Sequence, residues 1–149
     1  MTHPHNSNTA VVVDTTHSPY ARLRPLSLSQ VPLTDSFWSP RLEINRRVTL
    51  PSQYQQCEDT GRLNNFRRVT GAYQGEYQGP YYNDSDVYKW LEAASWTLAT
   101  HSDATLEAQV NDTIALIAAA QDTNGYLDTY FTFEREVERW TTLRVLHEL

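Results

Sequence analysis

Asp84 and Asp86 stand two residues apart and form the carboxyl pair whose chemistry has to be considered first. Glycoside hydrolases use two carboxyl groups, but these usually lie about 5 to 10 Å apart on facing elements. Asp84 and Asp86 instead flank Ser85 where a helix is expected to begin, and such side chains accept hydrogen bonds from the free N–H groups of a first turn. We therefore interpret both as helix-capping residues and keep Asp84 as a secondary candidate for substrate binding.

His147 is the strongest candidate for a binding residue. A neutral imidazole has one hydrogen-bond donor and one acceptor, which suits neighbouring hydroxyl groups. The alternatives are a core histidine bonded to a helix carbonyl and a frayed residue close to the end of the chain. Asn65 and Arg67 are further candidates from a loop that precedes the helix of Asp84, where packing and loop anchoring are equally good explanations.

The sequence contains one cysteine, Cys57, so an intrachain disulfide and a four-cysteine zinc site are both excluded. A lone cysteine inside a helix is usually a small buried apolar residue. His3, His5 and His17 are too sparse in a polar segment to define a metal site. We predict no catalytic residue, no metal ligand and no cofactor in this chain.

Charge and hydropathy exclude two classes of partner. The net charge of -6 argues against nucleic acid, which requires a clustered basic surface. The apolar run Val11–Val13 is much too short for a signal peptide or a membrane span, so no membrane partner is expected. A cytoplasmic location is the default expectation.

The elements that would position these residues are mainly helices. Residues 1–20 are polar without periodicity and are expected to form a mobile tail, and residues 21–149 a domain. Alternating leucines and prolines over 22–35 predict a short extended segment or an edge strand. The first helix is expected over 41–58, with Ser39 as its cap.

Two further helices are predicted from their apolar stripes. Val87, Leu91, Ala94 and Leu98 recur at helical spacing within 86–101, and Leu106, Val110, Ile114 and Ile117 do so within 104–122. Glycine and tyrosine predict a loop over 71–80, and a fourth helix should begin near Arg139 and run into the C-terminus. The expected fold class is all-α with a short extended N-terminal segment.

Five blocks in this order resemble the beta-L-arabinofuranosidase family of glycoside hydrolases, family 127. They are Asn65-Phe66-Arg67, the run from Asn83 to Ala94, Ala120-Gln121, Gly125-Tyr126-Leu127-Asp128-Thr129-Tyr130-Phe131, and Arg139-Trp140 followed by His147-Glu148-Leu149. The resemblance covers about residues 31–149. It implies that the predicted helices open an (alpha/alpha)6 barrel, and that His147 contacts the sugar in the parent enzyme.

The same resemblance implies retaining hydrolysis of L-arabinofuranosides by a parent protein that is much longer and continues into beta-sandwich domains. In such relatives a cysteine nucleophile lies on a zinc ion held by cysteines and a glutamate, and another glutamate is the acid and base. All of these follow the His-Glu-Leu block at which this chain stops. We therefore expect an inactive N-terminal fragment, with zinc and the arabinofuranoside bound only by the full-length parent.

A different class of function remains open. A free-standing helical module could bind a carbohydrate or a protein through the tyrosines of the loop before the second helix, which are Tyr73, Tyr77, Tyr81 and Tyr82. A stable module should hide its apolar stripes, whereas helices from an interrupted barrel should expose them and self-associate.

Overall fold

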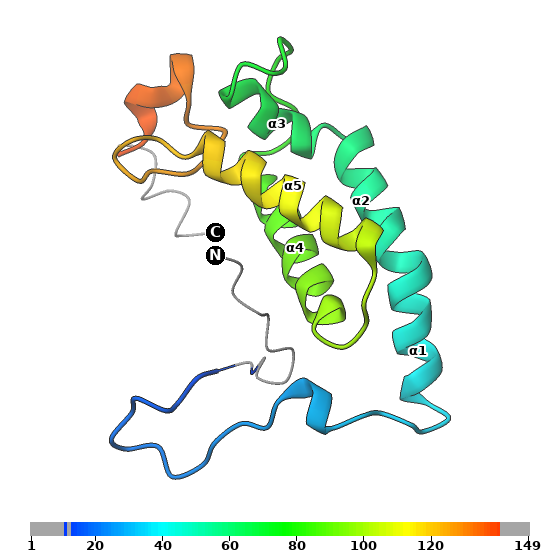
Figure 1. Cartoon of the computed structure of the whole chain (residues 1–149). Helices are drawn as coiled ribbons and strands as arrows, with labels where there is room; N and C mark the ends of the chain where they lie inside the picture. Colours follow the sequence, from blue (N-terminus) through cyan, green and yellow to red (C-terminus); the bar gives the residue numbers. More distant parts are fainter. Residues whose placement is uncertain (1–10, 12, 141–149) are drawn as a thin grey trace, which may run out of the picture.

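A computed structural model describes residue 11 and residues 13–140, and all regular structure in this part of the chain is helical (Figure 1). The α-helices are α1 (Trp38–Ile44), α2 (Leu50–Asp59), α3 (Arg62–Val69), α4 (Asp84–Leu98) and α5 (Ala104–Ala120). A π-helical turn, Asn45–Thr49, joins α1 to α2, and short 3-10 helices span Leu28–Gln30 and Phe133–Glu138. The predicted all-α class is confirmed for these residues.

The N-terminal arm runs as exposed, extended chain from residue 13 to α1, interrupted by the 3-10 helix Leu28–Gln30 (Figure 1). No strand forms anywhere in the described part of the chain, so the edge strand considered for 22–35 is wrong and the extended segment is correct. Leu23 and Leu26 are 87% and 66% exposed, because no partner strand lies beside them. Most of the predicted tail, residues 1–10 and 12, lies outside the described residues.

Helices α1 and α2 form one helical rod where a single helix over 41–58 was predicted. The predicted cap at Ser39 is wrong. Asp35 accepts hydrogen bonds from the backbone N–H groups of Phe37 and Trp38 and so starts the helix at Trp38, while the Ser39 hydroxyl donates to the Leu33 carbonyl at 2.6 Å. A carboxylate serves here as the first-turn acceptor, in keeping with the positive end of the helix dipole.

Pro51 explains the π-helical turn in the middle of this rod. Proline has no N–H for the carbonyl four residues before it, and its ring needs room beside that carbonyl. The wider turn at Asn45–Thr49 provides this room, and the Leu50 N–H closes it by donating to the Asn45 carbonyl. Only beyond the turn does the rod contribute to the core: Leu50 is fully buried, whereas Val48 is 60% exposed.

The core lies between α2, α3, α4 and α5 and consists of two adjoining clusters. The first contains Leu50, Trp90, Ala94, Leu106 and Val110, and the second Cys57, Leu63, Phe66, Val87 and Ala120. The Trp90 indole N–H donates to the Leu50 carbonyl at 3.0 Å, which satisfies the ring's polar edge in a buried position. The stripe predicted for α4 is confirmed, because Val87 and Ala94 are buried and Leu91 and Leu98 pack against the first cluster.

The helix α3 was not predicted. Gly61 was expected to end the first helix, and it does so with a left-handed φ of 77°, but the chain re-enters a helix at once. A Cβ atom at Gly61 would lie 1.9 Å from the Gln78 side-chain oxygen, so the turn lets α3 approach the loop before α4. Asn65 and Arg67 are therefore helical residues and not loop residues.

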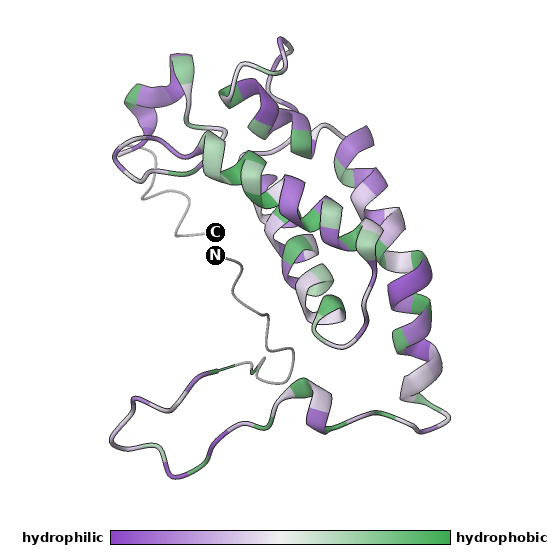
Figure 2. Cartoon of the chain, viewed as in Figure 1, coloured by the Kyte–Doolittle hydropathy of each residue, from purple (hydrophilic) through white to green (hydrophobic). Residues whose placement is uncertain are grey.

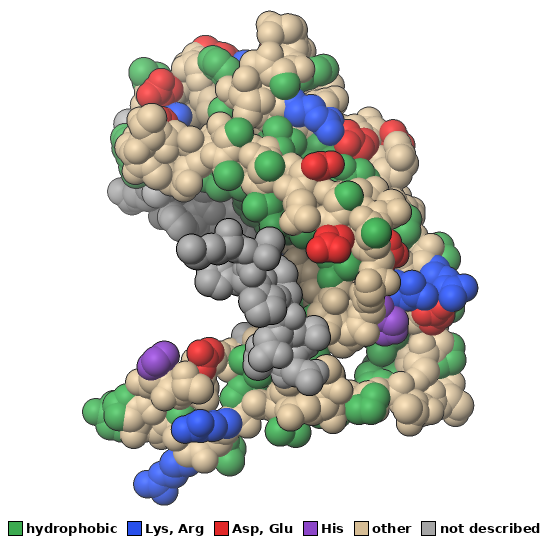
Figure 3. Space-filling view, viewed as in Figure 1, with side chains coloured by type: hydrophobic (Ala, Val, Ile, Leu, Met, Phe, Trp, Pro, Cys, Tyr) green, Lys and Arg blue, Asp and Glu red, His purple; other side chains and the backbone are tan. Residues whose placement is uncertain are grey.

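Apolar side chains remain on the outer surface of the bundle. Figure 2 shows hydrophobic residues along much of α5, and Figure 3 shows apolar side chains gathered over it. Ile114, predicted to lie in the core stripe of α5, is 49% exposed. On the α1 side, Leu42, Ile44 and Val48 are also exposed. None of the helices in the described ranges combines the length and the apolar character needed to cross a bilayer.

Candidate functional site

A polar cluster forms at the N-terminal end of α4, where two connections meet. One is the loop between α3 and α4, and the other is the segment that follows α5. The first residue of α4, Asp84, joins them: its carboxylate accepts the backbone N–H of Thr129 at 2.7 Å and the Thr129 hydroxyl at 2.5 Å. Both residues are buried. The site is thus built from segments 45 residues apart in the sequence.

The capping role predicted for Asp84 is wrong. The start of α4 has no side-chain cap, and the Asp84 carboxylate points to Thr129 and not to its own helix. Burial raises the pKa of Asp84 to about 6, and the two hydrogen bonds from Thr129 only partly offset this effect. A carboxyl group with such a pKa exchanges its proton near neutral pH, which is the property required of a general acid or base.

Asp128 places a second partly buried carboxyl group beside the first. It accepts the Tyr130 backbone N–H at 2.9 Å, and burial raises its pKa. Two tyrosines adjoin the pair: burial, followed by the charge of Asp84, raises the pKa of Tyr77 and Tyr88 above the usual range. Their phenols therefore stay protonated and can donate hydrogen bonds.

Asp86, the other member of the predicted carboxyl pair, is not part of this cluster. It bonds to Arg62 at 2.7 Å and to Lys89 at 3.4 Å. Burial acts to raise the pKa of Asp86, but the hydrogen bond and charge of Arg62 outweigh it and lower the pKa. Its capping role is also wrong, because this carboxylate joins α3 to α4 through an ion pair.

Asn65 anchors the loop before α4. Its amide N–H donates to the Gln78 carbonyl at 3.0 Å, and its amide oxygen accepts the Gln78 backbone N–H at 2.9 Å. Asn83 donates to the same carbonyl at 2.8 Å. Of the two explanations offered for Asn65, loop anchoring is therefore what the structure shows. Its buried amide is fully engaged and fixes the loop that flanks Asp84.

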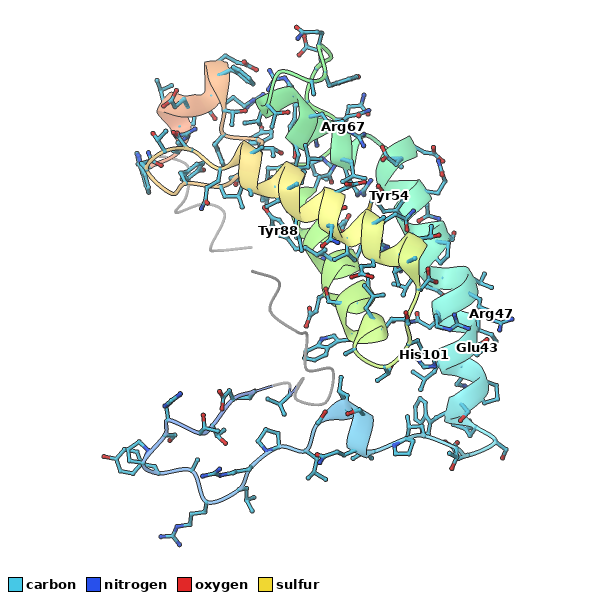
Figure 4. All side chains as sticks on the ribbon, viewed as in Figure 1. Glu43, Arg47, Tyr54, Arg67, Tyr88 and His101 are labelled. Carbon is cyan, nitrogen blue, oxygen red and sulfur yellow. The ribbon has the colours of Figure 1, made fainter. Side chains whose placement is uncertain are left out.

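Arg67 extends from α3 toward α2, the helix that carries Glu58 and Tyr54 (Figure 4). Its guanidinium forms two hydrogen bonds to the Glu58 carboxylate, at 2.6 and 2.7 Å, and a third to Asn64 at 2.8 Å. The hydrogen bond to Glu58 raises the pKa of Arg67 further. This bidentate pair joins α2 to α3, which shows the packing role considered for Arg67, and its role in binding stays a prediction.

Two buried polar atoms in this region have no hydrogen-bond partner among the described residues. They are the amide oxygen of Asn83 and the hydroxyl of Tyr126. Buried polar groups are rarely left unpaired, since the lost hydrogen bonds with water cost about 1 to 3 kcal/mol. The region therefore offers one acceptor and one hydroxyl to a molecule that can hydrogen-bond.

Arg139 closes the segment after α5. Its side chain is buried, donates to the Phe131 carbonyl at 2.7 Å and to Asp122 at 2.9 Å, and stacks over the Tyr126 ring at 4.2 Å. An open cavity of about 240 Å³ lies between this arginine and the end of α5, lined in part by Gln121, Asp128 and Tyr126. It holds carboxyl, amide, phenol and guanidinium groups, which suit hydroxyl-rich ligands.

Cys57 lies in the core and not in this site. It is buried among Leu63, Phe66 and Val87, and burial raises the pKa of its thiol. Such a thiol is neither a nucleophile nor a metal ligand at neutral pH. No group of three or more His, Cys, Asp or Glu side chains suited to a metal ion occurs within residue 11 and residues 13–140.

His147 lies outside the described residues, so its predicted sugar contact stays a prediction. The sequence did not single out Thr129, Asp128 and Arg139 as site residues, although all three lie in the Gly125–Phe131 and Arg139-Trp140 blocks that carried the resemblance. Their types gave no further indication, because threonine and arginine are ordinarily surface residues.

Comparisons with known proteins show which family this chain resembles. The family model described as beta-L-arabinofuranosidase, GH127 catalytic domain, matches residues 30–149. A non-reducing end beta-L-arabinofuranosidase of Bifidobacterium longum subsp. longum is 39% identical, over 80% of this chain and 22% of that protein. The chain thus spans about a fifth of this relative's length.

Two solved structures are similar as well. A GH127 beta-L-arabinofuranosidase from Geobacillus stearothermophilus T6 superposes with a TM-score of 0.75 at 38% identity, covering 79% of this chain and 20% of that one. A second GH127 beta-arabinofuranosidase superposes with a TM-score of 0.64 at 36% identity, over 69% of this chain and 16% of its own.

Proposed function

The chain belongs to the GH127 beta-L-arabinofuranosidase family, and from this membership we propose that it supplies the first helices of an (alpha/alpha)6 barrel in a retaining glycoside hydrolase. The proposed substrate is a beta-linked L-arabinofuranoside. The observation that carries the proposal is the identity of 39% to a beta-L-arabinofuranosidase over four-fifths of the chain.

The polar cluster at the start of α4 supports the proposal in chemical terms. A sugar presents neighbouring hydroxyl groups that both donate and accept hydrogen bonds. Asp84, with a pKa of about 6, the phenol of Tyr126 and the amide oxygen of Asn83 offer matching groups within one region. In this proposal the cluster shapes and polarises one wall of the sugar site.

The chain's own residues do not fit the zinc centre that the family resemblance implies. Such a centre requires several thiolates, whereas this sequence has a single cysteine, whose thiol is buried in the core. We therefore infer that the cysteine ligands of the zinc and the cysteine nucleophile come from residues outside these 149. The chain alone is proposed to be catalytically inactive.

A chimera tests the proposal. Residues 30–149 would replace the matching fifth of the Bifidobacterium longum enzyme, and hydrolysis of a chromogenic beta-L-arabinofuranoside would be measured. Turnover within about tenfold of the parent is expected, because a correct barrel opening restores the site. The 149-residue chain on its own should show neither turnover nor stoichiometric zinc in elemental analysis.

Two outcomes would contradict the proposal. Turnover by the isolated chain, with one zinc bound, would show that the missing residues are not needed. A folded but inactive chimera, together with an isolated chain that is monomeric and unfolds cooperatively, would favour an independent binding module. Circular dichroism of the chimera separates lost activity from lost folding.

A further inference from the structure

Four tyrosines from two distant segments meet beside the polar cluster. Tyr77, Tyr81 and Tyr82 come from the loop before α4, and Tyr130 comes from the segment after α5. Ring centroids lie 5.0 Å apart for Tyr77 and Tyr130, 6.3 Å for Tyr81 and Tyr130, and 5.1 Å for Tyr81 and Tyr82, each pair edge to face. These four residues are called the tyrosine platform below.

The platform lies on the surface and is not part of the core. Tyr82 is 57% exposed, and the other three rings are only partly buried. Neither of the two core clusters includes any of them. Tyr73, which the sequence grouped with these tyrosines, is not in ring contact with them, and its hydroxyl instead accepts a hydrogen bond from Gln78 at 3.3 Å.

The platform is held in place on both sides. The Tyr77 hydroxyl donates to the Pro80 carbonyl at 2.8 Å, and the Asn65 amide fixes the same loop through Gln78. On the other side, Thr129 is bonded to Asp84 immediately before Tyr130. A surface ordered before it meets its ligand loses less conformational entropy on binding.

The chemistry of the platform suits a neutral sugar ring that carries hydroxyl groups. Aromatic faces cover the C–H groups of a sugar, while phenol hydroxyls bond to its hydroxyl groups. Among the described residues, the cation that stacks on the platform is Arg135, whose guanidinium lies 4.4 Å from the Tyr130 centroid and 3.8 Å from the Glu138 carboxylate. Because a carboxylate compensates this charge, an anionic ligand gains little here.

We propose that the tyrosine platform is a sugar-binding surface that stacks a second sugar residue of an oligosaccharide on Tyr82, beside the polar cluster at the start of α4. This inference rests on the proposed function, since it assigns the platform to the part of the substrate that is not cleaved off. It adds a residue, Tyr82, that would set the preference for oligosaccharides over single-sugar glycosides.

Saturation-transfer NMR with a linear arabino-oligosaccharide tests the platform in the active chimera. Tyr82→Ala should weaken binding at least tenfold, and Tyr82→Leu should do the same because it keeps apolar bulk without a ring. Tyr82→Phe should change binding less than threefold. Trp38→Ala is the matched control, because Trp38 belongs to the transplanted residues and is 56% exposed at the start of α1, away from the platform.

The proposal is overturned if Tyr82→Ala binds as the unmodified chimera does, or if Trp38→Ala loses as much affinity. A Tyr82→Leu variant that binds normally would also overturn it, because apolar contact alone would then suffice. Failure of the proposed function looks different: a chromogenic glycoside with one sugar would not be cleaved, whereas oligosaccharide binding would still depend on Tyr82. If that glycoside is cleaved but oligosaccharide binding does not depend on Tyr82, the proposed function stands and only the platform proposal fails.

Discussion

Asp84 and Thr129 meet inside the protein with one carboxylate accepting both the backbone N–H and the hydroxyl of the threonine. Asp84 begins α4, and Thr129 belongs to the segment after α5, so this pair ties the start of one helix to the connection that leaves the other.

Asp84 should make stability depend on pH. Because burial raises the pKa of Asp84 from 3.8 to about 6, the folded protein keeps a proton that the unfolded chain has released between these pH values. The free energy of unfolding should therefore fall as the pH rises from about 4 to about 6, by on the order of 3 kcal/mol. Asp84→Asn should remove this part of the dependence in urea unfolding. Parallel curves for the two proteins would contradict it.

Thr129→Val should destabilise the protein most at neutral pH. The variant keeps the side-chain shape but removes the hydroxyl that donates to Asp84, leaving a buried carboxylate with one hydrogen bond fewer. The expected loss is about 1 to 3 kcal/mol near pH 7 and less near pH 4, where the carboxyl is protonated. Thr123→Val, at an exposed position of the same segment, is the control. Equal losses of stability in Thr129→Val and Thr123→Val would refute a specific role for the Thr129 hydroxyl.

Asn65→Ala should cost more stability than Arg67→Ala. Asn65 is buried and holds Gln78 by two hydrogen bonds, so the expected loss is about 2 to 3 kcal/mol. Arg67 makes a partly exposed ion pair with Glu58, for which about 1 kcal/mol is expected. Hydrogen exchange in residues 71–80 should increase only in Asn65→Ala. Unchanged exchange there would contradict loop anchoring.

His147→Ala, measured in the chimera, should lower kcat/KM about ten- to a hundredfold. A lost hydrogen bond to a sugar hydroxyl removes about 1 to 3 kcal/mol of transition-state stabilisation. The melting temperature should stay unchanged. A lower melting temperature with normal kinetics per folded molecule would instead identify a structural histidine and remove His147 from the site.

The isolated chain should self-associate. Four apolar side chains are about half exposed or more: Leu42, Ile44, Val48 and Ile114. Leaving several hundred Å² of apolar area in contact with water forgoes on the order of 10 kcal/mol of folding free energy. Light scattering after gel filtration should show oligomers, and a dye that binds apolar surface should fluoresce. Leu42→Gln with Val48→Gln should reduce both. A monomer that excludes the dye would refute this.

The sequence predicted the core helices because their apolar spacing is a local property. The stripe of α4 and the boundaries of α5 follow directly from residue types at helical intervals. The helix α3 was missed because it has eight residues, mostly polar, and is stabilised by distant groups: Arg67 pairs with Glu58, and Asn65 pairs with Gln78. Such pairings have no sequence period.

The carboxyl groups were misjudged for a similar reason. An aspartate at a helix start has an evident local use as a cap, and local residues cannot reveal that Thr129 will arrive from 45 residues away. Ile114 was expected in the core because the apolar spacing along a helix does not reveal how many neighbouring helices will cover it. Which face is covered depends on the tertiary arrangement, and α5 packs against α3 and α4 in a way that leaves Ile114 half exposed.

Arg139 closes the segment after α5 into a ring by bonding back to Asp122. Its bond to Asp122 joins residues 17 apart, and closing a stretch of that length costs about 2.5 kcal/mol of chain entropy, which the bonds of Arg139 to Asp122 and to the Phe131 carbonyl help to offset. Thr129, Tyr130 and Phe131 all lie within this ring. The Asp84–Thr129 pair and the tyrosine platform therefore both depend on the bonds of Arg139, so that removing this side chain would loosen both together.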